Sequence, residues 1–197
     1  AGEGGARARG LRYDSLRADE VELRLDVVRP LEPRGMLRLD ASGLQGAGFE
    51  ARSLALRAEG EPAAHRVQLE FDGTPVSTQL RFTGALVEDG WRGEVAELVL
   101  DAPRVARLAL QQPVALSWSG QVFDLARACF ADGEIRLCLE GRGGADGTLQ
   151  ARYELANLPL ALAAAFTPTA LPVALDGTID GDGRIARDAQ GTLQGAA

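Results

Sequence analysis

The chain repeats a short frame in which apolar and polar residues alternate. Its clearest copy is Ile135–Gly141, where Ile135, Leu137 and Leu139 are large and apolar, the residues between them are not, and Gly141 closes the run. Successive side chains of a strand point to opposite faces, so this alternation predicts an amphipathic β-strand with one apolar face. The closing glycine gives the backbone the freedom that a turn or bend needs.

The same frame recurs along most of the chain. Copies that end in glycine run over 37–43, 54–60, 67–73, 78–84, 114–120 and 171–177, and copies without the glycine over 21–27 and 149–155. Turn-forming residues separate the copies, as in Asp72-Gly73-Thr74-Pro75. This spacing predicts an all-β protein. The expected strands are 11–16, 20–28, 35–42, 52–59, 65–72, 76–85, 94–101, 104–110, 113–119, 121–130, 134–140, 147–156 and 171–180.

The remaining segments define the expected organisation of the chain. Residues 1–10 are rich in glycine and arginine and are interpreted as a loose lead-in, and residues 11–197 as one β-rich repeat segment of a longer chain. One short helix is expected near 157–166, with Asn157 as its cap, Pro159 in its first turn and Pro168 at its end. No run of about 18 apolar residues occurs, so we predict no membrane span in this segment.

The composition narrows the classes of partner. The chain has 21 basic and 28 acidic residues and a net charge of −7, which argues against a nucleic-acid-binding surface. Its hydrophobic content of 46% is typical of a globular protein rather than a disordered one. Aromatic residues make up only 5%, so the apolar faces of the strands are mainly aliphatic.

About a dozen such strands would present apolar faces with almost no helix to cover them. Burying one large aliphatic or aromatic side chain is worth about 1.5–3 kcal/mol, so these faces must be shielded from water. Two sheets can pack together, one sheet can close into a barrel, or a sheet can curl into a groove filled by another molecule. Stacked similar strands favour an elongated form. We therefore predict an elongated, curled, meandering antiparallel sheet whose open apolar groove suits acyl chains.

The chain has two cysteines, Cys129 and Cys138. If Gly133 and Glu134 form a two-residue type II′ turn, Cys129 falls directly opposite Cys138 as a non-hydrogen-bonded pair, within disulfide range. A type I′ turn over Asp132-Gly133 would offset the two sulfurs instead. We expect a disulfide, which would indicate an oxidising compartment. The alternative is two free thiols in a reducing cell.

Catalytic chemistry is not apparent in the pattern. His65, the only histidine, shares strand parity with Val67 and Leu69 and is interpreted as a hydrogen-bonded residue at a strand end. Most acidic residues fall at the outward positions of the repeat. No phosphate-binding loop and no nucleophile motif occurs in the sequence. We predict a protein that is not an enzyme and that holds no metal and no cofactor.

Several short motifs, taken in order, are similar to the middle of proteins of the TamB family. They are Leu39–Gly43, His65, Trp91–Gly93, Leu110–Pro113, Cys129–Phe130, Leu137–Leu139, Leu158–Leu162 and Leu175–Gly181. The resemblance covers most of residues 37–185. It implies kinship with AsmA-like proteins and a curled sheet called a β-taco. It also implies a periplasmic protein that is anchored in the inner membrane of a Gram-negative bacterium and that meets TamA in the outer membrane.

The resemblance and the strand pattern together indicate a function. The family implies passage of phospholipid between the two membranes, with acyl chains shielded by the inward side chains. One alternative is a chaperone-like module that assists assembly of outer-membrane proteins such as autotransporters with TamA, and another is a structural β-solenoid or sandwich of a secreted protein. The residues expected to line the groove are Leu37, Leu39, Leu54, Leu56, Val67, Leu69, Phe71, Leu80, Phe82, Val114, Leu116, Trp118, Ile135, Leu137 and Leu139.

Overall fold

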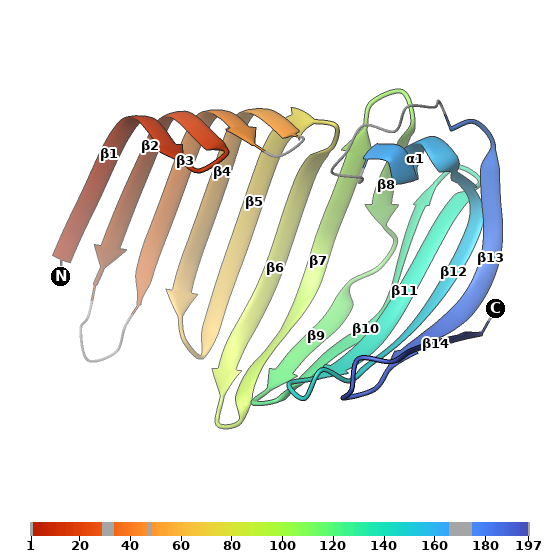
Figure 1. Cartoon of the computed structure of the whole chain (residues 1–197). Helices are drawn as coiled ribbons and strands as arrows, with labels where there is room; N and C mark the ends of the chain where they lie inside the picture. Colours follow the sequence, from red (N-terminus) through yellow and green to blue (C-terminus); the bar gives the residue numbers. More distant parts are fainter. Residues whose placement is uncertain (1, 29–33, 47–48, 166–174, 197) are drawn as a thin grey trace.

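A computed structural model describes residues 2–28, 34–46, 49–165 and 175–196. These residues form one 14-stranded antiparallel sheet in which strands that follow each other in the chain also pair in the sheet, except β8 and β9 (Figure 1). The sheet curls along its length, most strongly over its C-terminal half (Figure 1). The predicted all-β, curled and meandering fold is therefore confirmed.

The strands match the expected spacing closely. They are β1 (Gly2–Tyr13), β2 (Leu16–Val27), β3 (Gly35–Gly46), β4 (Phe49–Glu61), β5 (Ala64–Thr74), β6 (Ser77–Val87), β7 (Gly90–Ala102), β8 (Ala106–Leu110), β9 (Val114–Ser119), β10 (Val122–Asp132), β11 (Ile135–Gly144), β12 (Leu149–Pro159), β13 (Thr178–Arg187) and β14 (Leu193–Ala196).

Strands β8 and β9 together fill one position in the sheet. β8 pairs with the end of β7 and β9 with its beginning, and both pair with β10. The interruption falls at Gln111–Pro113, where proline has no N–H to donate to a neighbouring strand. The pair is therefore one strand broken in the middle.

Two predictions at the ends of the chain were wrong. The loose lead-in expected at residues 1–10 is instead part of β1, because Gly2–Arg9 pair with Glu20–Val27 of β2. The strand expected at 171–180 begins only at Thr178, as β13, and residues 171–174 lie outside the described residues. Strand β14 was not predicted at all.

One edge of the sheet is closed by bends in the first strands. Gly10 and Gly43 take positive φ angles of 62° and 59°, which glycine adopts without strain, and β1–β4 bend sharply at this end (Figure 1). Beyond the bend, Phe49 packs edge-on against Phe71 of the apolar face, with ring centroids 6.1 Å apart. The bent ends therefore turn over the apolar face.

Farther along the same edge, helix α1 (Leu160–Ala165) covers the apolar face (Figure 1). Leu162 is buried in the main hydrophobic core, and Val76 from the β5–β6 turn packs against the same cluster. The buried members of this cluster, which we call the α1 core, are Ala102, Ala106, Leu108, Val114, Ala128, Phe130 and Leu162.

The helix lies in the predicted region, but the roles predicted for Pro159 and Asn157 at its start were wrong. Pro159 is the last residue of β12 rather than part of the first helical turn. Asn157 is not a cap: it takes a φ of 50° and its backbone N–H donates to Asp180 Oδ1 at 2.8 Å. Pro168 lies outside the described residues. Across the described ranges, no helix has the length and apolar character needed to cross a membrane.

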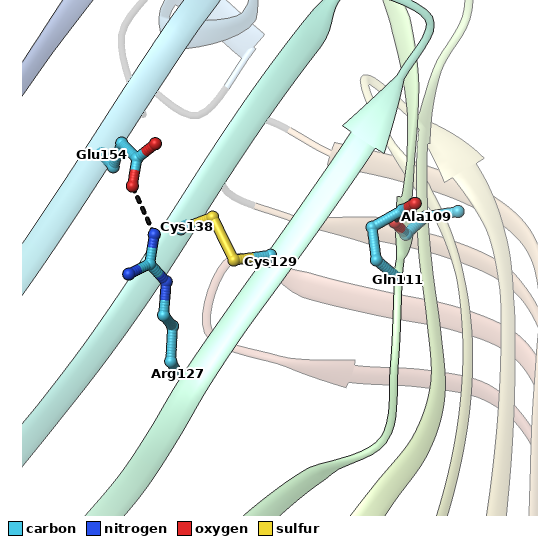
Figure 2. The surroundings of a disulfide bond; sticks show 6 residues. All are labelled: Ala109, Gln111, Arg127, Cys129, Cys138 and Glu154. Atoms are coloured by element: carbon cyan, nitrogen blue, oxygen red, sulfur yellow. Dashed lines mark hydrogen bonds and ion pairs between the residues drawn. A yellow bond between two sulfur atoms is a disulfide. The ribbon is translucent and has the colours of Figure 1, made fainter.

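The β10–β11 hairpin has the predicted register. Asp132 pairs with Ile135 and Cys129 with Cys138, and Gly133 takes a φ of 59°, as the first residue of a type II′ turn does. The structure has a disulfide between the two cysteines, whose Cα atoms are 4.0 Å apart. It lies on the outer, polar face, with the ion pair of Arg127 and Glu154 beside it (Figure 2).

Reduction of this disulfide is expected to lower the free energy of unfolding by about 2–3 kcal/mol, because it removes a short covalent loop that restricts the unfolded chain. Urea unfolding of the Cys129→Ser/Cys138→Ser variant, compared with the oxidised protein, measures the effect. Equal urea midpoints for the two proteins would show that the bond contributes nothing to stability.

Candidate functional site

The strand register aligns apolar side chains in rows that cross the sheet. Residues directly opposite each other in an antiparallel pair point to the same face. The central row, which we call the leucine row, consists of Leu23, Leu39, Leu56, Leu69, Leu80 and Leu98 on six successive strands.

A further row lies on each side of the leucine row. The first contains Leu25, Leu37, Ala58, Val67, Phe82, Val95 and Val114, and the second contains Val21, Ala41, Leu54, Phe71, Thr78, Leu100 and Leu108. A register shift in β7 leaves Ala96 unpaired with β6 and so keeps Val95 and Leu98 on the same face. We call these three rows the groove floor, except for Val114 and Leu108, which are buried in the α1 core. At this end of the floor, Leu98 and Leu100 pack against that core.

The predicted groove residues differ in how accessible they are. Most are only partly buried, as expected of a face that no second sheet covers: Leu37, Leu39, Leu54, Leu56, Val67, Leu69, Phe71, Leu80, Phe82 and Leu116. Trp118 and Leu139 are exposed, at 60% and 38%. Val114 is buried at 3%, and Ile135 and Leu137 pack against the α1 core. These last three residues therefore belong to the core at the helix end, and lipid contact at the others stays a prediction.

Several floor residues were missing from the predicted set. Leu23 and Leu25 continue the leucine row and its neighbour onto β2. The sequence does contain the pattern that identifies these two residues, because apolar and polar residues alternate over Val21–Val27 as they do in the other strands. Leu98 and Leu100 were harder to assign, because the irregularity at Ala96 breaks the alternation of β7.

Trp91 lies flat on the apolar face, over two glycines. A Cβ atom at Gly84 would lie 2.6 Å from Trp91 Cε2, and one at Gly93 would lie 2.6 Å from Trp91 Cζ2. The indole Nε1–H donates to His65 Nε2 at 2.8 Å, and Phe82 packs edge-on against the ring at 5.9 Å. His65 is thus a hydrogen-bonded residue at a strand end, as expected, and the glycines let the indole pack directly on the backbone.

Substituting Gly84 with valine is expected to displace Trp91, because the new side chain would overlap the indole ring. Overpacking of this kind typically lowers stability by about 1–3 kcal/mol. Fluorescence in a Trp118→Phe background should show the Trp91 emission shifting to longer wavelength. Gly181→Val in β13 is the control, because a Cβ there meets nothing within 4 Å. Equal effects of the two substitutions would contradict the packing.

The outer face carries ion pairs between neighbouring strands. Examples are Arg81–Glu97 at 2.7 Å, Arg52–Asp72 at 2.9 Å and Arg152–Glu140 at 3.3 Å. Hydrogen bonds from Arg7 and Arg24 lower the pKa of the Glu22 carboxyl, and Glu22 in turn raises the pKa of Arg7. All of these groups are at least partly exposed to solvent, so each pair contributes little to stability. Their effect is to keep this face wetted and charged.

Neither a metal site nor a buried charge occurs within the part of the chain that the structure describes. No group of three or more His, Cys, Asp or Glu side chains there is placed to hold a metal ion, and no polar or charged residue of that part is buried. The feature that distinguishes the molecule is the groove floor. The absence of catalytic activity stays a prediction.

Comparison with known proteins identifies the family. The model of the TamB N-terminal domain matches residues 5–197, almost the whole chain. The match is to the N-terminal domain of the family, whereas the sequence motifs had suggested its middle. No solved structure matches the chain. From the match over residues 5–197, the chain belongs to the TamB family.

Proposed function

We propose that the groove floor carries the acyl chains of phospholipids through the periplasm between the inner and outer membranes. The observation that carries this proposal is the leucine row, which crosses six strands and stays partly exposed to solvent. Membership of the TamB family supports a role in outer-membrane assembly or transport within the Gram-negative envelope.

The dimensions of the floor suit an extended hydrocarbon chain. Neighbouring strands lie about 4.8 Å apart, so the five steps from Leu23 to Leu98 span about 24 Å. Contacts between apolar groups have no preferred direction, so a chain in the groove can slide from one leucine to the next without breaking a specific bond. The floor would therefore hold many lipid species weakly rather than select one.

The disulfide supports the proposed location. Disulfides persist in oxidising environments such as the bacterial periplasm and are rare in the cytosol. The pairing of Cys129 with Cys138 therefore fits a periplasmic segment. The full-length protein would be anchored in the inner membrane and would meet TamA at the outer membrane.

A second candidate function is assistance in the assembly of outer-membrane proteins together with TamA. It is favoured by the long antiparallel strands β1–β7, which are 11 to 13 residues each. An unfolded strand of a client protein can add to an edge of such a sheet through backbone hydrogen bonds. The structural alternative is less well supported, because the α1 core fills only one end of the apolar face.

Native mass spectrometry of the chain purified from the periplasm tests the lipid function. We expect the spectrum of the folded protein to include the added masses of one or more bound phospholipids. Exchange into a delipidating detergent should remove these lipids and lower the melting temperature of the protein. A lipid-free protein whose melting temperature is the same before and after detergent would contradict the proposal.

A further inference from the structure

Three arginines lie directly opposite one another on the outer face of the sheet. Arg24 of β2 pairs with Arg38 of β3, and Arg38 pairs with Arg57 of β4. We call these three residues the arginine row. Like charges in such positions repel each other and destabilise a sheet. One strand farther on, the neutral Gln68 lies opposite Arg57, so strand pairing alone does not account for three arginines in succession.

Carboxylates of the neighbouring row hold two of these arginines in place. Arg24 Nε donates to Glu22 Oε1 at 2.6 Å, and Arg38 Nε donates to Asp40 Oδ2 at 2.6 Å. Each carboxylate lies two residues away on the same strand as its arginine. A guanidinium has five N–H donors, so these bonds orient the two side chains while other donors can still reach a ligand.

Arg57 is held differently from the other two. Its Nη2 contacts Met36 Sδ at 3.9 Å, and a thioether is only a weak acceptor. The acid two residues along its own strand, Glu59, is paired with Arg66 at 3.4 Å. In the part of the chain that the structure describes, the Arg57 guanidinium therefore has a sulfur contact in place of an ion pair.

The three guanidiniums line one cavity of about 530 Å³. Gly5 of β1 lies opposite Arg24 and also lines the cavity, so no side chain at that position fills the space beside the arginine row. Two acids of the lining, Glu3 and Asp26, lie opposite each other in the next row. The lining thus carries three positive and two negative side chains, with the negative ones on one side.

We propose that this cavity binds a phosphate group, held chiefly by Arg38 and Arg57. Side chains directly opposite each other have Cβ atoms about 5 Å apart, so both guanidiniums can donate to oxygens of one phosphate. The planar fork of arginine donates two parallel hydrogen bonds to such an anion. Glu3 and Asp26 repel the anion and so favour the Arg57 end of the row. This site goes beyond the proposed function, because it lies on the opposite face of the sheet from the groove floor.

Side-chain NMR of the chain labelled with ¹⁵N-arginine tests the site, with inorganic phosphate as the probe and sodium chloride keeping the ionic strength constant. We expect the Nε–H signal of Arg38 to shift and to saturate. Arg57→Gln should weaken phosphate binding by about tenfold, because a hydrogen bond to a charged group is lost. Its melting temperature should be no lower, since a like charge opposite Arg38 is removed.

Arg81→Gln is the matched control, because Arg81 lies two strands farther along the same row and pairs with Glu97 at 2.7 Å. This variant should bind phosphate as the unaltered chain does. Arg57→Lys, which keeps the charge but lacks the fork, replaces Arg57→Gln if circular dichroism shows that the latter is misfolded. No saturable shift, the same shift with sodium chloride alone, or equal affinity after the Arg57 substitution would overturn the site.

Flotation with phosphatidylglycerol vesicles identifies the source of the phosphate. Flotation that the Arg57 substitution abolishes, and that Arg81→Gln leaves intact, would assign the phosphate to a lipid headgroup at a membrane surface. Phosphate binding without flotation that depends on Arg57 would assign it to a soluble phosphate ester. Both results retain the site, whereas flotation lost equally in the Arg57 and Arg81 variants, with no saturable phosphate binding, would leave only general charge attraction and overturn it.

Discussion

Replacing Leu108 with alanine is expected to lower the free energy of unfolding by about 2–5 kcal/mol, because the change leaves a cavity in a packed core. Leu108 is 1% exposed and belongs to the α1 core with Phe130 and Leu162. Most other apolar side chains of the sheet are only partly buried, so this cluster carries an unusual share of the tertiary packing. Urea unfolding followed by circular dichroism measures the loss.

Leu86→Ala is the matched control for that experiment. The same atoms are removed from a side chain that is 57% exposed, and surface substitutions usually change stability by less than about 0.5 kcal/mol. A Leu108→Ala protein as stable as the Leu86→Ala protein would show that α1 does not hold the curled end of the sheet together.

The Leu56→Lys/Leu69→Asp double variant is expected to lose at least about tenfold of its bound phospholipid, because removing even one leucine contact weakens apolar binding by about 1.5 kcal/mol. The two residues lie directly opposite each other in the leucine row. Opposite charges in that position can pair across the strands, so the sheet should stay folded while its floor becomes polar. Mass spectrometry of extracted lipid, normalised to protein, measures the loss.

The control places the same two residues on the outer face. Arg57 and Gln68 are directly opposite each other on the same two strands, one position along. The Arg57→Lys/Gln68→Asp variant should carry as much phospholipid as the unaltered protein. Equal losses in both double variants would point to general destabilisation, and no loss in the leucine-row variant would rule out the floor as the lipid surface.

The sequence predicted the repeated strands well because each strand has one wetted face and one apolar face. The alternation around Ile135, Leu137 and Leu139 with a type II′ turn at Gly133-Glu134 predicted the register of the β10–β11 hairpin that the structure has, including the pairing of Cys129 with Cys138. The type I′ alternative over Asp132-Gly133 would have offset the two sulfurs. Register follows from local rules there, because a two-residue turn leaves little choice of pairing.

Other features depend on contacts that the local pattern does not contain. In β1, glycine and alanine occupy the apolar positions opposite Val21–Val27, so the alternation was too weak to identify a strand. The α1 core unites segments far apart in the chain, which is why Val114, Ile135 and Leu137 were assigned to an open groove instead. Trp91 could not be placed either, because its position depends on glycines of two strands and on His65.

Photo-crosslinking in the periplasm tests the central claim most directly. A photoreactive residue replaces Leu39 or Leu69 on the groove floor, or their outward neighbours Arg38 or Gln68, in the full-length protein. Phospholipid adducts at Leu39 and Leu69 but not at Arg38 and Gln68 are the predicted result. Lipid adducts at all four positions, or protein adducts alone at Leu39 and Leu69, would contradict a groove that carries acyl chains.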